Sequence, residues 1–128
     1  MIIAVDFDGT LFDHDFPRIG APRHWLIRKV IEWKQAGHKI ILWTCREDVP
    51  AGHPTFAEGQ YLTDAVNACR QVGLEFDAVN RNLEEQIPGI YSRKIFADLY
   101  LDDKSVAFLD DSHTFTFNRR LCVGGNFL

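Results

Sequence analysis

Cysteine is scarce in this sequence, and long apolar runs are absent from it. Its 128 residues include only three widely spaced cysteines, Cys45, Cys69 and Cys122. An odd number at wide spacing argues against a disulfide framework and is typical of a reducing cytoplasm. The five histidines show no zinc-ligand spacing. No stretch approaches the length that crosses a bilayer, and the apolar start has no basic residues, so we expect neither a membrane span nor a signal peptide.

A basic excess is also missing. The chain has 14 Lys and Arg against 18 Asp and Glu, a formal net charge of -4, with no cluster of basic residues. Such a chain repels a phosphate backbone, which excludes a typical nucleic-acid-binding module. The 12% of aromatic residues and the lack of low-complexity runs exclude a disordered chain. The length, without internal repeats or an evident boundary, predicts one domain over residues 1–128.

Apolar runs of strand length alternate with segments of helical period. The pattern predicts strands over residues 2–7, 39–44, 76–80 and 95–101, and helices over residues 22–36 and 60–72. The order of strands and helices predicts an α/β fold: a Rossmann-like, three-layer sandwich with a mostly parallel sheet, helices on both faces and no separate cap domain.

Four other segments are less regular. We expect a long loop at 48–59, a weak helical turn at 83–87, a fifth, edge strand at 106–109, and either strand or helix at 115–123.

Polar residues follow several of these strands. Asp6 and Asp8 end the first strand, Thr44 ends the second, and Asp102 and Asp103 end the fourth. Ligands bind beyond the carboxyl ends of parallel strands, so these side chains are expected at one edge of the sheet. If the fourth strand lies beside the first, four carboxylates meet there, and they cannot all stay ionised without a cation. Mg²⁺, a hard ion that prefers oxygen ligands, is the predicted partner.

The string Asp-Phe-Asp-Gly-Thr-Leu at residues 6–11 resembles the first motif of the haloacid dehalogenase (HAD) superfamily. Thr44, Lys94 and the acidic pair at 102–103 follow in that superfamily's order. The stretches at 43–47, 76–80 and 97–103 also resemble a small branch without a cap. The resemblance spans residues 2–104 and implies a HAD-like catalytic domain with phosphatase activity.

The same resemblance implies roles for four residues. Asp6 would be the nucleophile that accepts the phosphoryl group as an aspartyl phosphate. Asp8 would be the general acid and base. Thr44 would hydrogen-bond the phosphoryl oxygens, and Lys94 would balance their charge. A carboxylate at position 8, which dehalogenases of this superfamily lack, favours hydrolysis of a phosphate monoester over cleavage of a carbon–halogen bond.

The implied Mg²⁺ site consists of Asp6, the backbone carbonyl of Asp8, and Asp102, with Asp103 supporting it directly or through water. A second acidic pair, Asp110 and Asp111, competes with Asp102 and Asp103 for this role. Of the two pairs, we favour Asp102 and Asp103.

Arg46, Asn80 and Asn82 also stand at strand ends and are candidates for contact with substrate. Cys45 is not expected to be a phosphatase nucleophile, because Ala51 stands where the loop of such enzymes needs an arginine. The expected partner is a phosphorylated substrate whose identity the sequence leaves open, as it does the oligomeric state. Two alternatives are a scaffold protein with weak or no catalysis and a phospho-acceptor module similar to response-regulator receivers.

Overall fold

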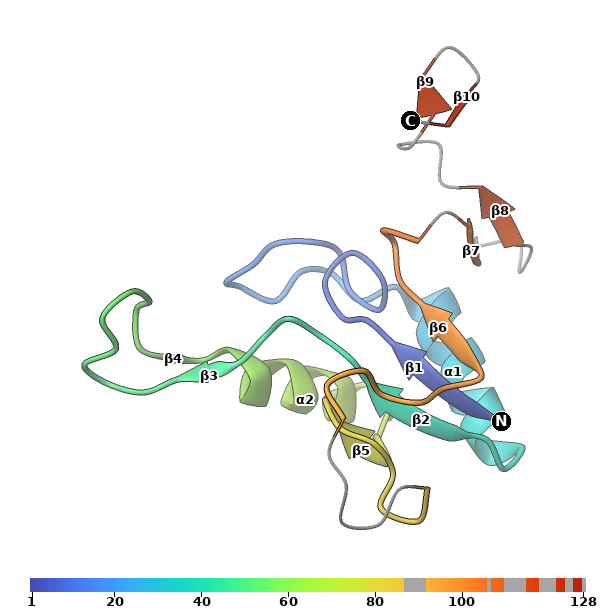
Figure 1. Ribbon diagram of the computed structural model, residues 1–128, viewed down its shortest axis with the longest axis horizontal. Coiled ribbons are helices and arrows are strands. Elements are labelled where there is room, and N and C mark those ends of the chain that lie inside the picture. The colour runs from blue at the N-terminus through green and yellow to red at the C-terminus, as the bar shows by residue number, and fades with distance from the viewer. Residues whose placement is uncertain (87–91, 106, 110–114, 118–121, 124–125, 128) are drawn as a thin grey trace.

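The centre of the fold is a four-stranded, wholly parallel sheet in a computed structural model (Figure 1). The structure describes residues 1–86, 92–105, 107–109, 115–117, 122–123 and 126–127. The strands are β1 (Ile2–Val5), β2 (Lys39–Leu42), β5 (Ala78–Val79) and β6 (Leu99–Leu101), in the order β5-β2-β1-β6. The predicted α/β class, its mostly parallel sheet and the place of the fourth strand beside the first are confirmed.

The observed strands are shorter than the predicted ones, because each can pair only where its neighbour also runs. β1 is buried along its whole length, as expected of a central parallel strand. The backbone N–H groups of Asp98 and Asp6 donate to Ile2 and Leu101 at the two ends of the β1–β6 ladder. Residues before 98 therefore have no part of β1 to pair with.

The two faces of the sheet are covered differently. Helices α1 (His24–Gln35) and α2 (Tyr61–Gln71) pack on the same face, the one that carries Ile3 and Val5. The face that carries Ala4 packs against segments without helical structure, which contribute Leu83, Ile95 and Ala97. The prediction of helices on both faces is thus wrong for the described residues. The expected helical turn at 83–87 is a single hydrogen-bonded turn, in which the Gln86 backbone N–H donates to the Leu83 carbonyl at 3.0 Å, and residue 87 lies outside the described residues.

Both helices end at glycines, as their sequences predict. Gly37 and Gly73 have φ angles of 97° and 89°, a left-handed conformation that stops a helix at little cost for glycine. The expected loop at 48–59 is bounded by a short antiparallel ribbon of β3 (Asp48–Val49) and β4 (Gly59–Gln60). The Asp48 carboxylate accepts hydrogen bonds from the backbone at the start of α2, which ties this ribbon to the helix.

Beyond β6 the strands form separate pairs (Figure 1). β7 (Ala107–Leu109) pairs with β8 (Phe115–Phe117), and β9 (Cys122–Val123) pairs with β10 (Asn126–Phe127), both antiparallel. Residues 107–109 are therefore a strand, but not the predicted edge strand of the central sheet. No helix in the described part of the chain is long and apolar enough to cross a membrane.

Candidate active site

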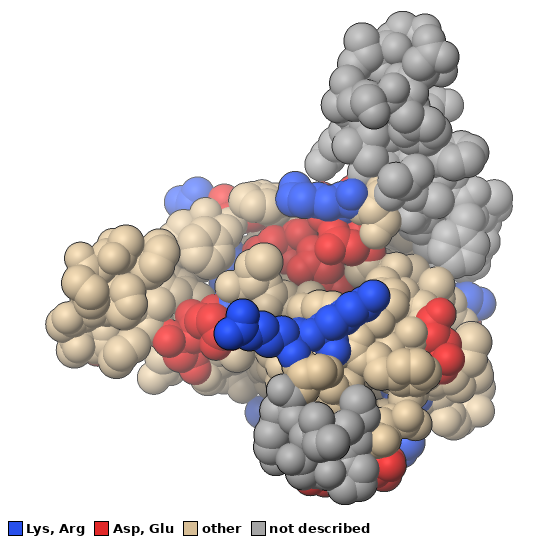
Figure 2. All heavy atoms as spheres, in the orientation of Figure 1, with Lys and Arg blue, Asp and Glu red and all other residues tan. Residues whose placement is uncertain are grey.

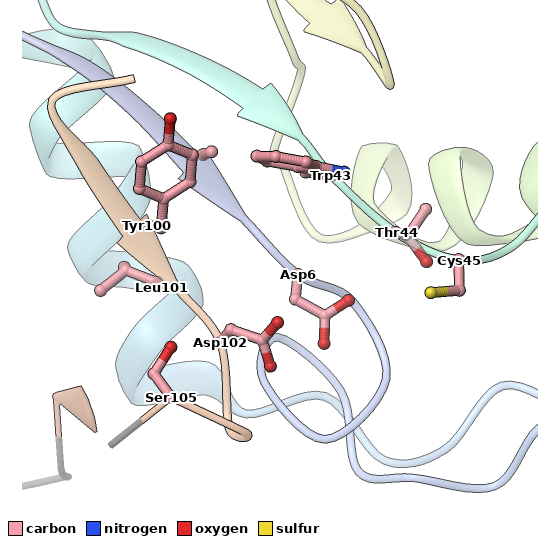
Figure 3. A pocket seen from close by; sticks show the side chains of 9 residues that line it. Asp6, Trp43, Thr44, Cys45, Tyr100, Leu101, Asp102 and Ser105 are labelled. Atoms are coloured by element: carbon pink, nitrogen blue, oxygen red, sulfur yellow. The ribbon is translucent and has the colours of Figure 1, made fainter. Parts of the chain in front are cut away.

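The carboxyl ends of the parallel strands bring the predicted site residues together. Asp6 follows β1, and its backbone N–H donates to the Leu101 carbonyl at 2.9 Å, which extends the β1–β6 ladder by one residue. Asp102 comes next after Leu101, so the two acids lie side by side at the end of adjacent strands. Thr44 lies on the neighbouring β2 side of Asp6 (Figure 3).

Three carboxylates meet at this point. One oxygen of each of Asp6, Asp102 and Asp103 lies within 4.8 Å of the other two. Carboxylate oxygens are the hard ligands that Mg²⁺ prefers, so the three side chains could hold such an ion. Of the predicted ligands, these three are brought together. The competing Asp110 and Asp111 lie outside the described residues.

The loop after β1 holds Asp103 in place. The Thr10 hydroxyl accepts a hydrogen bond from the Asp103 backbone N–H at 3.0 Å and lies 3.5 Å from an Asp6 carboxylate oxygen, to which it donates. A Cβ atom at Gly9 would lie 2.6 Å from an Asp103 carboxylate oxygen, and Gly9 has a φ angle of +83°. Only glycine therefore fits here. Thr10, to which the sequence alone assigned no role, links two of the acids.

Burial and neighbouring charges act together on the Asp6 carboxyl group. Burial of its carboxyl group raises the pKa of Asp6 from 3.8 to about 7. The charge of Asp102 adds to this rise, with smaller additions from Asp103 and Asp8, while the backbone N–H of Phe7 opposes it. Figure 2 shows acidic side chains gathered in one patch with Lys and Arg side chains on both sides. Such a cluster favours a bound cation.

Two adjoining pockets open at Asp6, with volumes of about 210 and 270 Å³. Asp6, Thr44, Cys45 and Asp102 line both of them. Figure 3 shows the smaller pocket, in which the Asp6 and Asp102 side chains lie near those of Thr44 and Cys45. A phosphate-sized group can thus approach Asp6 with Thr44 on one side and Asp102 on the other.

Thr44 is held by its neighbours. Its backbone N–H donates to the Asn80 side-chain oxygen at 2.9 Å, and its hydroxyl accepts from the Arg46 backbone N–H at 3.1 Å. Asn82, another candidate for contact with substrate, instead accepts from the Phe96 backbone N–H at 2.6 Å. Both asparagines therefore bind backbone N–H groups of the protein through their side-chain oxygens.

Asp8 has a partner that the sequence does not indicate. Its two carboxylate oxygens accept hydrogen bonds from Nε and Nη2 of Arg46, both at 2.8 Å. The Arg46 side chain is only 1% exposed. Nothing in the local pattern pairs residues that stand 38 positions apart. The arginine that was a candidate for contact with substrate therefore binds the predicted general acid.

The structure brings a second lysine to the site. Lys94, predicted from the superfamily order, is exposed and lines neither of the two pockets at Asp6. Lys104 lines the larger pocket together with Asp6, Asp8 and Asp102. Its position two residues after Asp102 in the sequence is the signal that could have identified it.

Comparisons with known proteins relate the chain to a protein of solved structure. No protein-family model and no curated protein matches the chain. A solved structure, described as that of a conserved protein from Bacteroides thetaiotaomicron, is 40% identical in sequence, with a TM-score of 0.67. The match covers 83% of this chain and 78% of that one.

Proposed function

This chain belongs to the same family as the conserved Bacteroides thetaiotaomicron protein, and we propose that it is a Mg²⁺-dependent phosphatase of HAD type. The observation that carries the proposal is the position of the Asp6 carboxylate. It lies in a pocket beside Thr44, with carboxylate oxygens of Asp102 and Asp103 within 4.8 Å. A nucleophilic carboxylate between a hydroxyl donor and a cation-binding pair suits attack on a phosphate ester.

Hydrolysis would proceed in two steps, transfer of the phosphoryl group to Asp6 and hydrolysis of the aspartyl phosphate. An Asp6 carboxylate oxygen attacks phosphorus, the bond from phosphorus to the ester oxygen breaks, and Asp8 gives its proton to the departing oxygen. Water then attacks the phosphorus of the aspartyl phosphate and gives a proton to Asp8. The bond between Asp6 and phosphorus breaks, and phosphate leaves. Thr44 donates a hydrogen bond to the phosphoryl oxygens in both steps.

Asp6, Asp102 and Asp103 would hold Mg²⁺, with the backbone carbonyl of Asp8 as the further ligand that the resemblance implies. The ion would supply positive charge that lets the phosphate approach the acidic cluster. Lys104, on the wall of the larger pocket, is a second candidate beside Lys94 for balancing the remaining charge. The single catalytic domain and the cytoplasmic location stay predictions.

The two alternatives receive less support. A receiver-like module would place its acceptor aspartate after the third strand of the parallel sheet in sequence order, which is β5. Asn80 occupies that place, and its side-chain oxygen accepts from the Thr44 backbone. A scaffold without catalysis would not need Asp6 in an open pocket, and turnover separates it from a phosphatase.

The test is hydrolysis of p-nitrophenyl phosphate with Mg²⁺ and with a chelator. We expect turnover only with Mg²⁺, and a loss of roughly 1,000-fold or more in Asp6→Asn because the nucleophile is gone. Asp64→Asn is the matched control, since Asp64 is exposed on α2, and it should keep wild-type activity. Equal rates with and without the metal, or full activity of Asp6→Asn, would refute the proposal.

A further inference from the structure

Every hydrogen-bond donor of the Arg46 guanidinium is used inside the protein. Nε and one N–H of Nη2 bind the two carboxylate oxygens of Asp8. The other N–H of Nη2 donates to the Arg18 carbonyl at 2.7 Å, and Nη1 donates to the carbonyls of Pro17 at 3.3 Å and Tyr61 at 3.2 Å. A guanidinium has five N–H donors, and five acceptors surround this one. None is left for a phosphate, so Arg46 does not bind substrate.

Two aromatic rings lie against this guanidinium. Its central carbon lies 5.0 Å from the ring centroid of buried Phe7 and 5.1 Å from that of Phe16, which is 51% exposed. A planar, five-donor cation held in this way cannot be replaced by a lysine, whose ammonium has three donors and no plane. The position of the guanidinium is therefore determined by the fold around it.

Arg46 also separates Asp8 from the other acids. The carboxylates that gather for a cation are those of Asp6, Asp102 and Asp103, and Asp8 is not among them. Asp8 stands two residues from Asp6, and its charge already acts on Asp6. Without the two hydrogen bonds from Arg46, the Asp8 side chain would be free to rotate toward a cation bound at the other three carboxylates.

We propose that Arg46 is the positioning residue that keeps Asp8 available for proton transfer and out of the cation site. This inference rests on the proposed phosphatase function. The same guanidinium binds the carbonyls of Pro17 and Arg18, so it links Asp8 to residues 13–22, which follow the loop after β1. The orientation of Asp8 thus depends on where that segment lies.

The test compares two substrates that differ in their need for a proton. p-Nitrophenyl phosphate releases a stable anion, whereas glycerol phosphate releases an alkoxide that must be protonated. We expect Arg46→Lys to lose at least tenfold more kcat on glycerol phosphate than on p-nitrophenyl phosphate, as Asp8→Asn does. The variant that carries both Arg46→Lys and Asp8→Asn should have a kcat no lower than that of Asp8→Asn alone, because Arg46 acts through Asp8.

Arg23→Gln is the matched control. Arg23 also joins the loop after β1 to residues 13–22, because it donates to the Gly9 carbonyl at 2.6 Å and to Asp13 at 2.9 Å. Neither of these hydrogen bonds involves Asp8. Its loss should be small and equal on both substrates. Mg²⁺ affinity, measured by calorimetry, is a readout without turnover. Mg²⁺ should bind at least about threefold more tightly to Arg46→Gln than to the wild type. It should not bind more tightly to Arg23→Gln, nor to the variant that combines Arg46→Gln with Asp8→Asn.

The outcomes separate the two proposals. A wild-type protein that hydrolyses neither substrate overturns the phosphatase function and this inference with it. A wild-type protein that hydrolyses both, with equal loss on both in Arg46→Lys, overturns the inference alone. Mg²⁺ affinity that is unchanged in Arg46→Gln, or tightened equally in Arg23→Gln, also overturns it. Thermal unfolding of each variant shows whether lost activity is merely lost folding, and Arg46→Lys replaces Arg46→Gln if the latter does not fold.

Discussion

The replacement Asp6→Asn should stabilise the metal-free protein at neutral and higher pH, although it removes the proposed nucleophile. Burial and the neighbouring acids raise the pKa of Asp6 from 3.8 to about 7. When the folded-state pKa lies above the unfolded one, the folded protein binds more protons between the two values, so stability falls as the pH rises through this range. The cost is absent below about pH 4 and complete above about pH 7.

The size of this cost follows from the shift. Roughly three pKa units correspond to about 4 kcal/mol, and screening by solvent in the open pockets reduces this to on the order of 2 kcal/mol. We therefore expect Asp6→Asn to exceed the wild type in free energy of unfolding by about 2 kcal/mol near pH 8, and by roughly half of that or less near pH 5. Millimolar Mg²⁺ should reverse the order, because it binds the folded wild type and relieves the repulsion.

Urea denaturation in the presence of a chelator, repeated at several pH values and then with Mg²⁺, measures both effects. Asp48→Asn is a control of opposite sign. Hydrogen bonds from Thr63 lower the pKa of Asp48, so its stabilising effect is present at neutral pH and is lost as the pH falls. If Asp6→Asn is less stable than the wild type near pH 8, or if the difference does not vary with pH, then burial and the neighbouring acids do not disfavour the ionised form of Asp6 in the folded protein.

Two further predictions concern residues that line the pockets. Lys104→Ala should raise KM for p-nitrophenyl phosphate by about tenfold, because a positive charge near the phosphate is lost. A larger rise in KM in Lys94→Ala would show that Lys94, the lysine predicted from the sequence, balances this charge instead. Exposed Cys45 should react with iodoacetamide in the folded protein and be protected by a bound phosphate analogue such as vanadate. Cys69, whose pKa burial raises to about 12, should react only after unfolding, and mass spectrometry of the labelled peptides distinguishes the two.

Much of the sheet and most of the acidic cluster follow from local sequence. The run over residues 2–5 is apolar at every position, as expected of a strand buried on both faces, and β1 is such a strand. The acids that directly follow β1 and β6 must then meet wherever those strands are neighbours, because parallel strands share one carboxyl edge. The meeting of Asp6 and Asp102 is therefore predictable from the order of apolar runs and acids along the chain.

The sequence by itself determined which residues are buried in strands and which acids follow them, because burial and alternation leave a periodic trace along the chain. Only the tertiary structure decided that Arg46 binds Asp8, that Lys104 lines a pocket, and that both described helices share one face of the sheet. These contacts depend on the path of loops between distant residues. Such paths are set by the packing of the whole domain and leave no periodic trace in the chain.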